Sequence, residues 1–287
     1  MHKHSKEKTE KTVAAHLNKV MDVMGRTHKL DLSYFDEAFL NRTVLKRLDG
    51  TDKTVEEYGS FLAEDRKEAE ILFHSLWVTY SEFFRNPLTF GLLEQLILPG
   101  LFEAREKSEK SELRFWSAGC AAGQEPFSLA ILIDQLLKGR KRPVPFRIFA
   151  TDYSLTEVSQ ARKGLFNRSV MGNVRLRHLS EYFAGNGDSY TLSPRIREGV
   201  DFSVYDLLDV RTTCPPACIF GDFDLVFCCN VLIYYRAEIQ QAILNKMKRC
   251  LRSGGFLIVG EAERAIVSRT GGFEAVVPGG EVFRWLG

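Results

Sequence analysis

The sequence lacks the long apolar segments that carry proteins into or across membranes. Its richest apolar run, residues 223–235, is short and contains Asp224 and Asn230, so it does not resemble a membrane-spanning helix. The first residues, Met1-His2-Lys3-His4, are charged and are not followed by the apolar segment of a signal peptide. We therefore expect a cytoplasmic protein that is not inserted in a membrane.

The 287 residues also lack a large excess of one charge, and they lack a C-x-x-C motif. Lys and Arg total 39 and Asp and Glu total 37, so the net charge of +2 predicts no nucleic-acid partner. The six cysteines include no C-x-x-C pair and are interpreted as reduced thiols. Cys214 and Cys218 flank two prolines without a nearby histidine, so we expect no metal site.

The motifs that bind dinucleotides and nucleoside triphosphates, G-x-G-x-x-G and G-x-x-x-x-G-K-[ST], are absent. Gly119 and Gly123 instead separate a strand pattern from a helix pattern that begins near Glu125, a turn that lets a ligand approach the backbone. The next predicted strand ends at Asp152, where an acid can accept hydrogen bonds from a ribose. S-adenosylmethionine, which has a ribose and no pyrophosphate, is the candidate ligand. The glycines alone are equally compatible with a packing turn.

The N-terminal part of the chain predicts only amphipathic helices. Apolar residues recur at helical spacing in four segments, about 12–24, 31–48, 54–62 and 66–77. The third segment opens with a capping box at Thr54. The second carries a basic stripe, which by itself is typical of a solvated helix face: Arg42, Lys46 and Arg47. We place a domain boundary just before Thr79, which gives a helical domain at 1–78 and a second domain at 79–287.

From Leu113 onward, strand and helix patterns alternate, which predicts an α/β domain with a mainly parallel sheet. Before it, a helix is expected at 90–102 and a linker or solvated helix end at 103–112. Residues 182–204 interrupt the alternation, and we expect them to form a small β-subdomain with a turn near 185–188. The last segments, 273–277 and 282–286, are expected to form a hairpin.

Four motifs, in this order, resemble those of the chemotaxis receptor glutamate methyltransferases (CheR). They are Ser-Glu-Phe-Phe-Arg at 81–85, the glycine turn at 116–126, Ala-Thr-Asp at 150–152 and Phe-Cys-Cys-Asn-Val-Leu-Ile-Tyr-Tyr at 227–235. The resemblance covers nearly the whole chain. It implies a Rossmann-like class I methyltransferase sheet with a terminal antiparallel hairpin, a small inserted β-subdomain and an N-terminal all-helical domain.

The resemblance also implies an activity and roles for individual residues. A methyl group would pass from S-adenosylmethionine to glutamate side chains on the cytoplasmic helical region of a methyl-accepting chemotaxis receptor, leaving S-adenosylhomocysteine. Arg85 and Tyr234 would act at the reacting groups, and the basic stripe on the helical domain would dock the receptor. A monomer is expected. The cofactor-binding residues would be Thr79, Ser81, Arg85, Gly119, Glu125, Asp152, Asp206, Leu207, Asn230 and Val231.

The chain departs from the family pattern at Gln124, where a second glutamate is common. The loop at 185–190 is short beside members that bind a receptor C-terminal peptide, so tethering stays open. Two other functions also stay open. An N-methyltransferase of another protein usually has Pro-Pro and an aromatic residue where Val231 follows Asn230 here. A non-catalytic signalling scaffold that binds S-adenosylmethionine is the second alternative.

Overall fold

The computed structural model describes residues 16–107, 112–138, 140, 144–218 and 221–287. The chain divides into two compact units, which we call the helical unit and the sheet unit. The helical unit runs to Val78 and also contains Ile233–Ile239, a segment that the sequence-based division had assigned to the second domain. The sheet unit comprises Thr79–Leu232 and Gln240–Gly287.

The helical unit contains a helix at residues 16–28 followed by three more helices. These are α2 (Glu37–Leu48), α3 (Val55–Glu64) and α4 (Arg66–Ser75). The predicted start of the first helix, at residue 12, lies outside the described residues. The second helix begins later than predicted because Asp36 is its N-cap and accepts a hydrogen bond from the Phe39 N–H at 3.0 Å. The predicted capping box between Thr54 and Glu57 is confirmed.

The segment Ile233–Ile239 packs against the residues that precede α2. Phe35 forms a β-bridge with Tyr235, and their rings stack with centroids 5.4 Å apart. The Arg236 guanidinium donates a hydrogen bond to the Phe35 carbonyl at 3.1 Å. The long-range partner Tyr235 therefore holds Phe35 in a β-bridge, so the helix predicted from residue 31 is wrong at Phe35 despite the helical spacing of its apolar residues.

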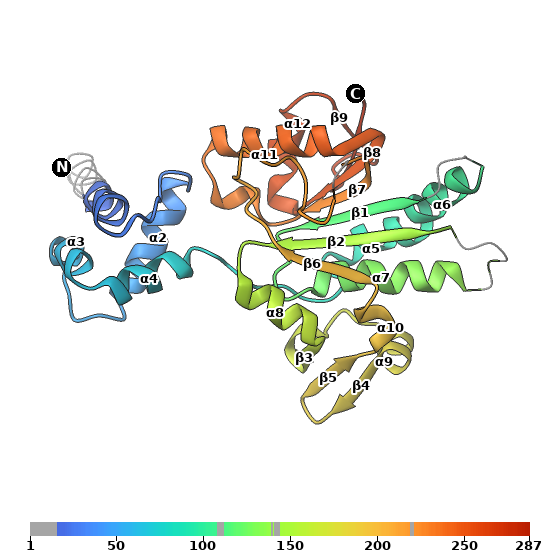
Figure 1. Ribbon diagram of the computed structural model, residues 1–287, viewed down its shortest axis with the longest axis horizontal. Coiled ribbons are helices and arrows are strands. Elements are labelled where there is room, and N and C mark those ends of the chain that lie inside the picture. Colours follow the sequence, from blue (N-terminus) through green and yellow to red (C-terminus); the bar gives the residue numbers. More distant parts are fainter. Residues whose placement is uncertain (1–15, 108–111, 139, 141–143, 219–220) are drawn as a thin grey trace, which may run out of the picture. The chain divides into compact units, whose positions relative to one another are not determined.

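The sheet unit is built on a seven-stranded sheet in the order β6-β2-β1-β7-β8-β10-β9 (Figure 1). Its first five strands are parallel, and β10 runs antiparallel to both β8 and β9. This topology confirms the expected Rossmann-like sheet with a terminal antiparallel hairpin. The strands are β1 (Leu113–Ala118), β2 (Phe146–Asp152), β6 (Val200–Val204), β7 (Phe223–Cys228), β8 (Leu251–Val259), β9 (Phe273–Ala275) and β10 (Val282–Trp285).

Both faces of the sheet are buried, as the apolar run in β7 predicts. Figure 1 shows α7 (Gln124–Leu137) and α8 (Leu155–Lys163) on one face and α11 (Ala237–Cys250) on the other. Alternate residues of a strand therefore enter two different cores. Phe115 belongs to the core on the α7 face, whereas its neighbour Trp116 packs against Tyr205 and Phe223.

A long helical stretch precedes β1. It consists of α5 (Pro87–Leu92), a π-helical turn at Leu93–Ile97 and α6 (Leu98–Glu106), so it exceeds the predicted helix 90–102 at both ends. The charged tract after residue 102 is partly buried rather than only solvated, because Arg105 pairs with Asp224 of β7 at 2.6 Å. Arg252 also pairs with Asp224, which explains how this apolar strand tolerates a buried acid.

The small β-subdomain is a three-stranded sheet in the order β3-β5-β4. The strands β4 (Phe183–Asn186) and β5 (Ser189–Leu192) form a hairpin at the predicted turn. The expected limits, 182–204, differ from the observed sheet. The strand β3 (Leu165–Asn167) comes earlier, and Val200–Val204 is β6 of the large sheet because it pairs with β2. Between β5 and β6, Pro194 starts a short helix, α10 (Pro194–Arg197), in place of the expected strand.

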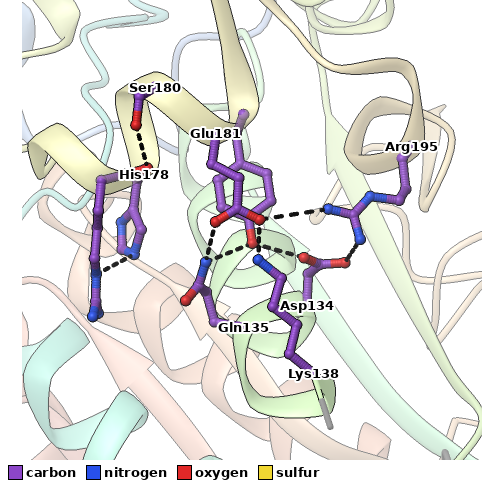
Figure 2. A network of polar contacts seen from close by, with 9 residues as sticks. Asp134, Gln135, Lys138, His178, Ser180, Glu181 and Arg195 are labelled. Carbon is purple, nitrogen blue, oxygen red and sulfur yellow. Dashed lines mark hydrogen bonds and ion pairs between the residues drawn. The ribbon is translucent and has the colours of Figure 1, made fainter.

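A polar network attaches this subdomain to α7 (Figure 2). The Tyr182 hydroxyl, at the end of α9 (Leu176–Tyr182), donates to Asp134 of α7 at 2.7 Å. Gln135 donates to Glu181 at 2.9 Å, and Arg195 of α10 pairs with Asp134. The subdomain is thus tied to a helix that packs directly on the central strands.

Candidate active site

The glycine turn after β1 lies at the carboxyl end of the parallel strands. The N–H groups of Gly119 and Cys120 both donate to the Thr151 carbonyl of β2, at 2.8 and 2.9 Å. Gly119 has a φ of +77°, and a Cβ there would come within 2.6 Å of Val231. Gly123 has a φ of +92° and is the N-cap of α7. Both positions therefore need glycine, for backbone conformation and for close packing.

Glu125 occupies the first turn of α7, beside the end of β1. Its Oε1 atom accepts a hydrogen bond from the Ser117 hydroxyl at 2.7 Å. Burial raises the pKa of Glu125 to about 7, although hydrogen bonds from Ser117 and Cys229 and the charge of Arg85 act in the opposite direction. An ammonium group placed beside this carboxyl would favour its ionised form.

Asp152, the last residue of β2, faces the same turn. Its carboxylate accepts hydrogen bonds from the Ala121 and Ser154 N–H groups, both at 2.9 Å. Burial raises the pKa of Asp152, and these hydrogen bonds act to lower it. A carboxylate offers about four acceptor positions, so it retains capacity for the two hydroxyls of a ribose.

Asp206 and Leu207 follow β6, the strand beside β2. The Asp206 carboxylate accepts a hydrogen bond from the Leu208 N–H at 2.8 Å, and both predicted residues are half-buried. Burial and then the charge of Asp206 raise the pKa of Tyr153, which follows Asp152. The structure therefore brings Asp152, the predicted ribose acceptor, and the predicted cofactor-binding residues Asp206 and Leu207 to the ends of neighbouring strands.

Asn230 and Val231 form the turn after β7. Asn230 has a φ of +58°, in the left-handed region that asparagine tolerates better than most residues. A residue that the sequence analysis missed, Glu263, accepts hydrogen bonds from the N–H groups of Asn230 and Val231, both at 2.8 Å. A local signal for it existed, because Glu263 also bonds to the Gly260 N–H as in a capping box.

Arg85 lies in the irregular segment before α5, which is anchored by the two phenylalanines that precede it. Phe83 packs edge-on against Phe166 of β3 and Phe183 of β4, and Phe84 stacks on His178 of α9. Arg85 itself donates to the Tyr80 carbonyl at 3.2 Å and covers the Tyr80 ring. The other predicted residues here are Thr79, which is exposed, and Ser81, which is half-buried.

Tyr234, the other predicted catalytic residue, belongs to the helical unit. Its carbonyl accepts a hydrogen bond from the Asp36 N–H at 2.9 Å, and its ring lies 4.8 Å from that of Phe39. The predicted catalytic pair is therefore divided between the units, because Arg85 belongs to the sheet unit.

The basic stripe on α2 is smaller than expected. Arg42 and Lys46, four residues apart, are exposed. Arg47 is not available to bind a partner as Arg42 and Lys46 are, because its guanidinium pairs with the buried Glu68 through two hydrogen bonds of 2.7 Å. The Tyr58 hydroxyl donates to the same carboxylate at 2.8 Å. Since Arg47 is one position beyond Lys46, it is rotated by about 100° around the helix and faces α4.

These groups fit S-adenosylmethionine. The turn at Gly119 and Gly123 exposes backbone without side chains, and the partly buried Glu125 suits the amino end of the methionine moiety. The Gln124 side-chain oxygen is buried without a hydrogen-bond partner, so it provides a further acceptor beside the turn. Within the described ranges, no cluster of three or more His, Cys, Asp or Glu side chains could bind a metal ion. The same part of the chain contains no helix that could cross a bilayer.

The sheet topology and the acids at the carboxyl ends of its parallel strands fit an S-adenosylmethionine-dependent methyltransferase. Residues 79–277 match the family described as CheR methyltransferase, SAM binding domain. The chain belongs to this family.

Named relatives support the assignment. Chemotaxis protein methyltransferase 1 of Pseudomonas aeruginosa is 34% identical over 68% of this chain and 69% of its own length. The chemotaxis protein methyltransferase of Listeria monocytogenes is 31% identical over 85% of this chain and 88% of its own length. An uncharacterized 104.1 kDa protein of Rhodobacter capsulatus is 29% identical over 87% of this chain. The match covers only 25% of the length of that larger protein.

Proposed function

We propose that this enzyme forms methyl esters on glutamate side chains in the cytoplasmic helical region of a methyl-accepting chemotaxis receptor. The observation that supports the proposal most directly is the match of residues 79–277 to the CheR family, together with relatives named chemotaxis protein methyltransferases. The enzyme would act in the cytoplasm as a monomer.

The chemistry requires alignment rather than a base. The pKa of a free glutamate side chain is about 4.3, so the substrate carboxylate is already ionised at neutral pH. When bound, S-adenosylmethionine supplies an activated methyl group, and a C–O bond forms as the S–C bond breaks to leave S-adenosylhomocysteine. The task of this chain is to orient the carboxylate and exclude water, which can contribute about 7 to 11 kcal/mol.

Arg85 and Tyr234 are the groups proposed to orient the substrate. The Arg85 guanidinium would hold the carboxylate through charge-assisted hydrogen bonds. The charge of Arg85 lowers the pKa of Glu125, the residue proposed to hold the amino end of the cofactor, and this supports the role of Arg85. The Tyr234 hydroxyl would donate a further hydrogen bond. On the helical unit, Arg42 and Lys46 would attract the acidic receptor helices.

The decisive experiment incubates the purified protein with methyl-labelled S-adenosylmethionine and membranes rich in chemoreceptors. Label should enter the receptor band and leave as methanol under mild alkali, because glutamyl methyl esters hydrolyse there. Label that survives alkali would instead support an N-methyltransferase. Cofactor binding without any incorporation would support a non-catalytic scaffold.

Arg85→Ala and Tyr234→Phe should each lower kcat by about 10- to 100-fold, since each removes a hydrogen bond to a charged group that is worth about 1.5–3 kcal/mol. The affinity for S-adenosylhomocysteine should change much less in Tyr234→Phe, whereas Arg85→Ala should also weaken it, because the charge of Arg85 lowers the pKa of Glu125. Arg168→Ala, at an exposed arginine of the sheet unit, is the control and should retain full activity. Unchanged turnover in Arg85→Ala would contradict its assigned role.

A further inference from the structure

Glu263 is a fully buried carboxylate that the catalytic scheme above does not use. It lies in the short 3-10 helix at Glu261–Glu263, immediately after β8, and its exposed fraction is 0%. A buried carboxylate is costly unless hydrogen bonds compensate for the water that it has lost. The partners of Glu263 therefore indicate what it does.

Four backbone N–H groups donate to this single carboxylate. Oε1 accepts from Val231 at 2.8 Å and from Leu232 at 2.6 Å. Oε2 accepts from Asn230 at 2.8 Å and from Gly260 at 2.7 Å. Three of the four donors are consecutive residues of the turn after β7. Glu263 thus holds that turn from a position about thirty residues later in the chain.

The turn at Asn230–Leu232 combines an unusual backbone conformation with close packing on both sides. Asn230 is in the left-handed region, and the consecutive N–H groups of Asn230, Val231 and Leu232 all donate to Glu263. On one side, Val231 fills the space that a Cβ on Gly119 would need. On the other side, Asn230 packs so closely on Gly260 that a Cβ there would lie 2.7 Å from its Nδ2 atom. The turn after β7 therefore packs closely against both Gly119 and Gly260.

We infer that Glu263 is a positioning residue that pre-organises the cofactor-binding turn at Asn230–Leu232. Its negative charge matches the partial positive charges of four N–H groups, so the turn is ordered before any ligand arrives. The inference rests on the proposed function only through its cofactor. The proposed function gains a named residue, Glu263, that fixes the backbone of the cofactor-binding turn after β7.

The test compares Glu263→Gln with wild type. A glutamine offers one acceptor oxygen and one NH₂ donor, so two of the four backbone N–H groups would face a donor instead of an acceptor. We expect the amides of Asn230, Val231 and Leu232 to exchange at least about 10-fold faster in the cofactor-free variant, as measured by hydrogen exchange. The Kd for S-adenosylhomocysteine, measured by calorimetry, should rise by about 10- to 100-fold, the effect of losing one hydrogen bond to a charged group.

Glu261→Gln is the matched control, because Glu261 lies in the same 3-10 helix and is exposed. It should behave as wild type in both measurements. A purely structural role for Glu263 would lower the unfolding temperature of Glu263→Gln while leaving the Kd and the exchange of the three amides unchanged. That result would overturn the inference.

Gly260→Ala perturbs the same contacts without replacing Glu263, since its Cβ would lie 2.7 Å from Asn230 Nδ2 and 3.1 Å from Glu263 Oε2. It keeps the inference testable if Glu263→Gln does not fold. Its Cβ would push against Asn230, so the Kd should again rise. A normal Kd in a folded Gly260→Ala protein would contradict the inference. Failure of the wild-type protein to bind S-adenosylhomocysteine would instead contradict the cofactor on which the proposed function depends.

Discussion

The sheet unit and the helical unit present their functional groups in different ways. In the sheet unit, Asp152 and Glu263 are bonded to backbone N–H groups, and Glu125 is bonded to a neighbouring hydroxyl. In the helical unit, Arg42 and Lys46 are exposed side chains on one face of α2. The first arrangement holds its carboxylates by hydrogen bonds to the backbone or to a neighbouring side chain, whereas the second presents charge on long, flexible side chains.

The difference suggests a division of tasks. A small ligand whose methyl group must be aligned needs a rigid site, because misplacement of the reacting atoms slows the reaction. A large protein substrate can be attracted without a unique contact geometry, which surface charge provides. Substitutions in the sheet unit should therefore have large effects that depend little on salt, and those on α2 should have small effects that depend strongly on salt.

The largest effect is expected for Gly119→Ala. The new Cβ would meet Val231 at 2.6 Å in a left-handed backbone conformation, so the turn after β1 or the turn after β7 must move. Strain of this kind costs about 1–3 kcal/mol, and with the added clash we expect the Kd for S-adenosylhomocysteine to rise about 100-fold or more. Gly100→Ala, at a helical glycine with open space around it, is the control and should bind normally.

Asp152→Ala should have the next largest effect. It removes the acceptors proposed for the ribose and also the bonds to the Ala121 and Ser154 N–H groups. Hydrogen bonds to a charged group are worth about 1.5–3 kcal/mol, so calorimetry should give a Kd that is about 10- to 100-fold weaker. Asp188→Ala, at an exposed acid in the small subdomain, should leave the Kd unchanged. An unaltered Kd in Asp152→Ala would remove the ribose assignment.

The pH dependence of cofactor binding should follow Glu125. Its pKa of about 7 in the cofactor-free protein means that a proton must leave before the carboxyl can pair with an ammonium group. Affinity for S-adenosylhomocysteine should therefore fall by about tenfold for each pH unit below about 7, and level off above that pH. Glu125→Gln should lose this dependence. A similar pH profile in the variant would assign the titration to another group.

The same shift affects the stability of the cofactor-free protein. The pKa of Glu125 is raised from 4.5 in the unfolded chain to about 7 in the fold, so the unfolded state releases its proton first as the pH rises. Stability contributed by this residue should decline between these two pH values and stay constant above them. Thermal unfolding of wild type and Glu125→Gln across this range measures the contribution.

The smallest effect is expected for the double reversal Arg42→Glu with Lys46→Glu. The KM for the receptor should rise by about 3- to 10-fold at low salt, and the difference should shrink near physiological salt because exposed charges are screened. Cofactor affinity should not change. The double reversal Lys53→Glu with Lys67→Glu makes the same charge change away from α2 and is the control. An equal rise in KM for both pairs would indicate that net charge alone matters.

Much of the fold could be predicted because its signals are local. The capping box at Thr54, the glycine turn after β1 and the apolar run of β7 each lie within about ten residues of sequence. Predictions failed where a distant partner decided the outcome. Phe35 followed helical spacing but pairs with Tyr235, and Val200–Val204 followed strand spacing but joined a different sheet from the one expected.

The candidate site divides in the same way. The sequence by itself indicated the glycine turn and the acid at Asp152, and the family resemblance added Glu125. Their cofactor-binding roles stay predictions. Only the tertiary structure decided that Arg47 is neutralised by Glu68 and that Glu263 holds the turn after β7. These pairs are separated by 21 and 33 residues, and no local pattern specifies which buried charge will meet which donor. Such contacts arise only when the packing of whole elements brings the partners together.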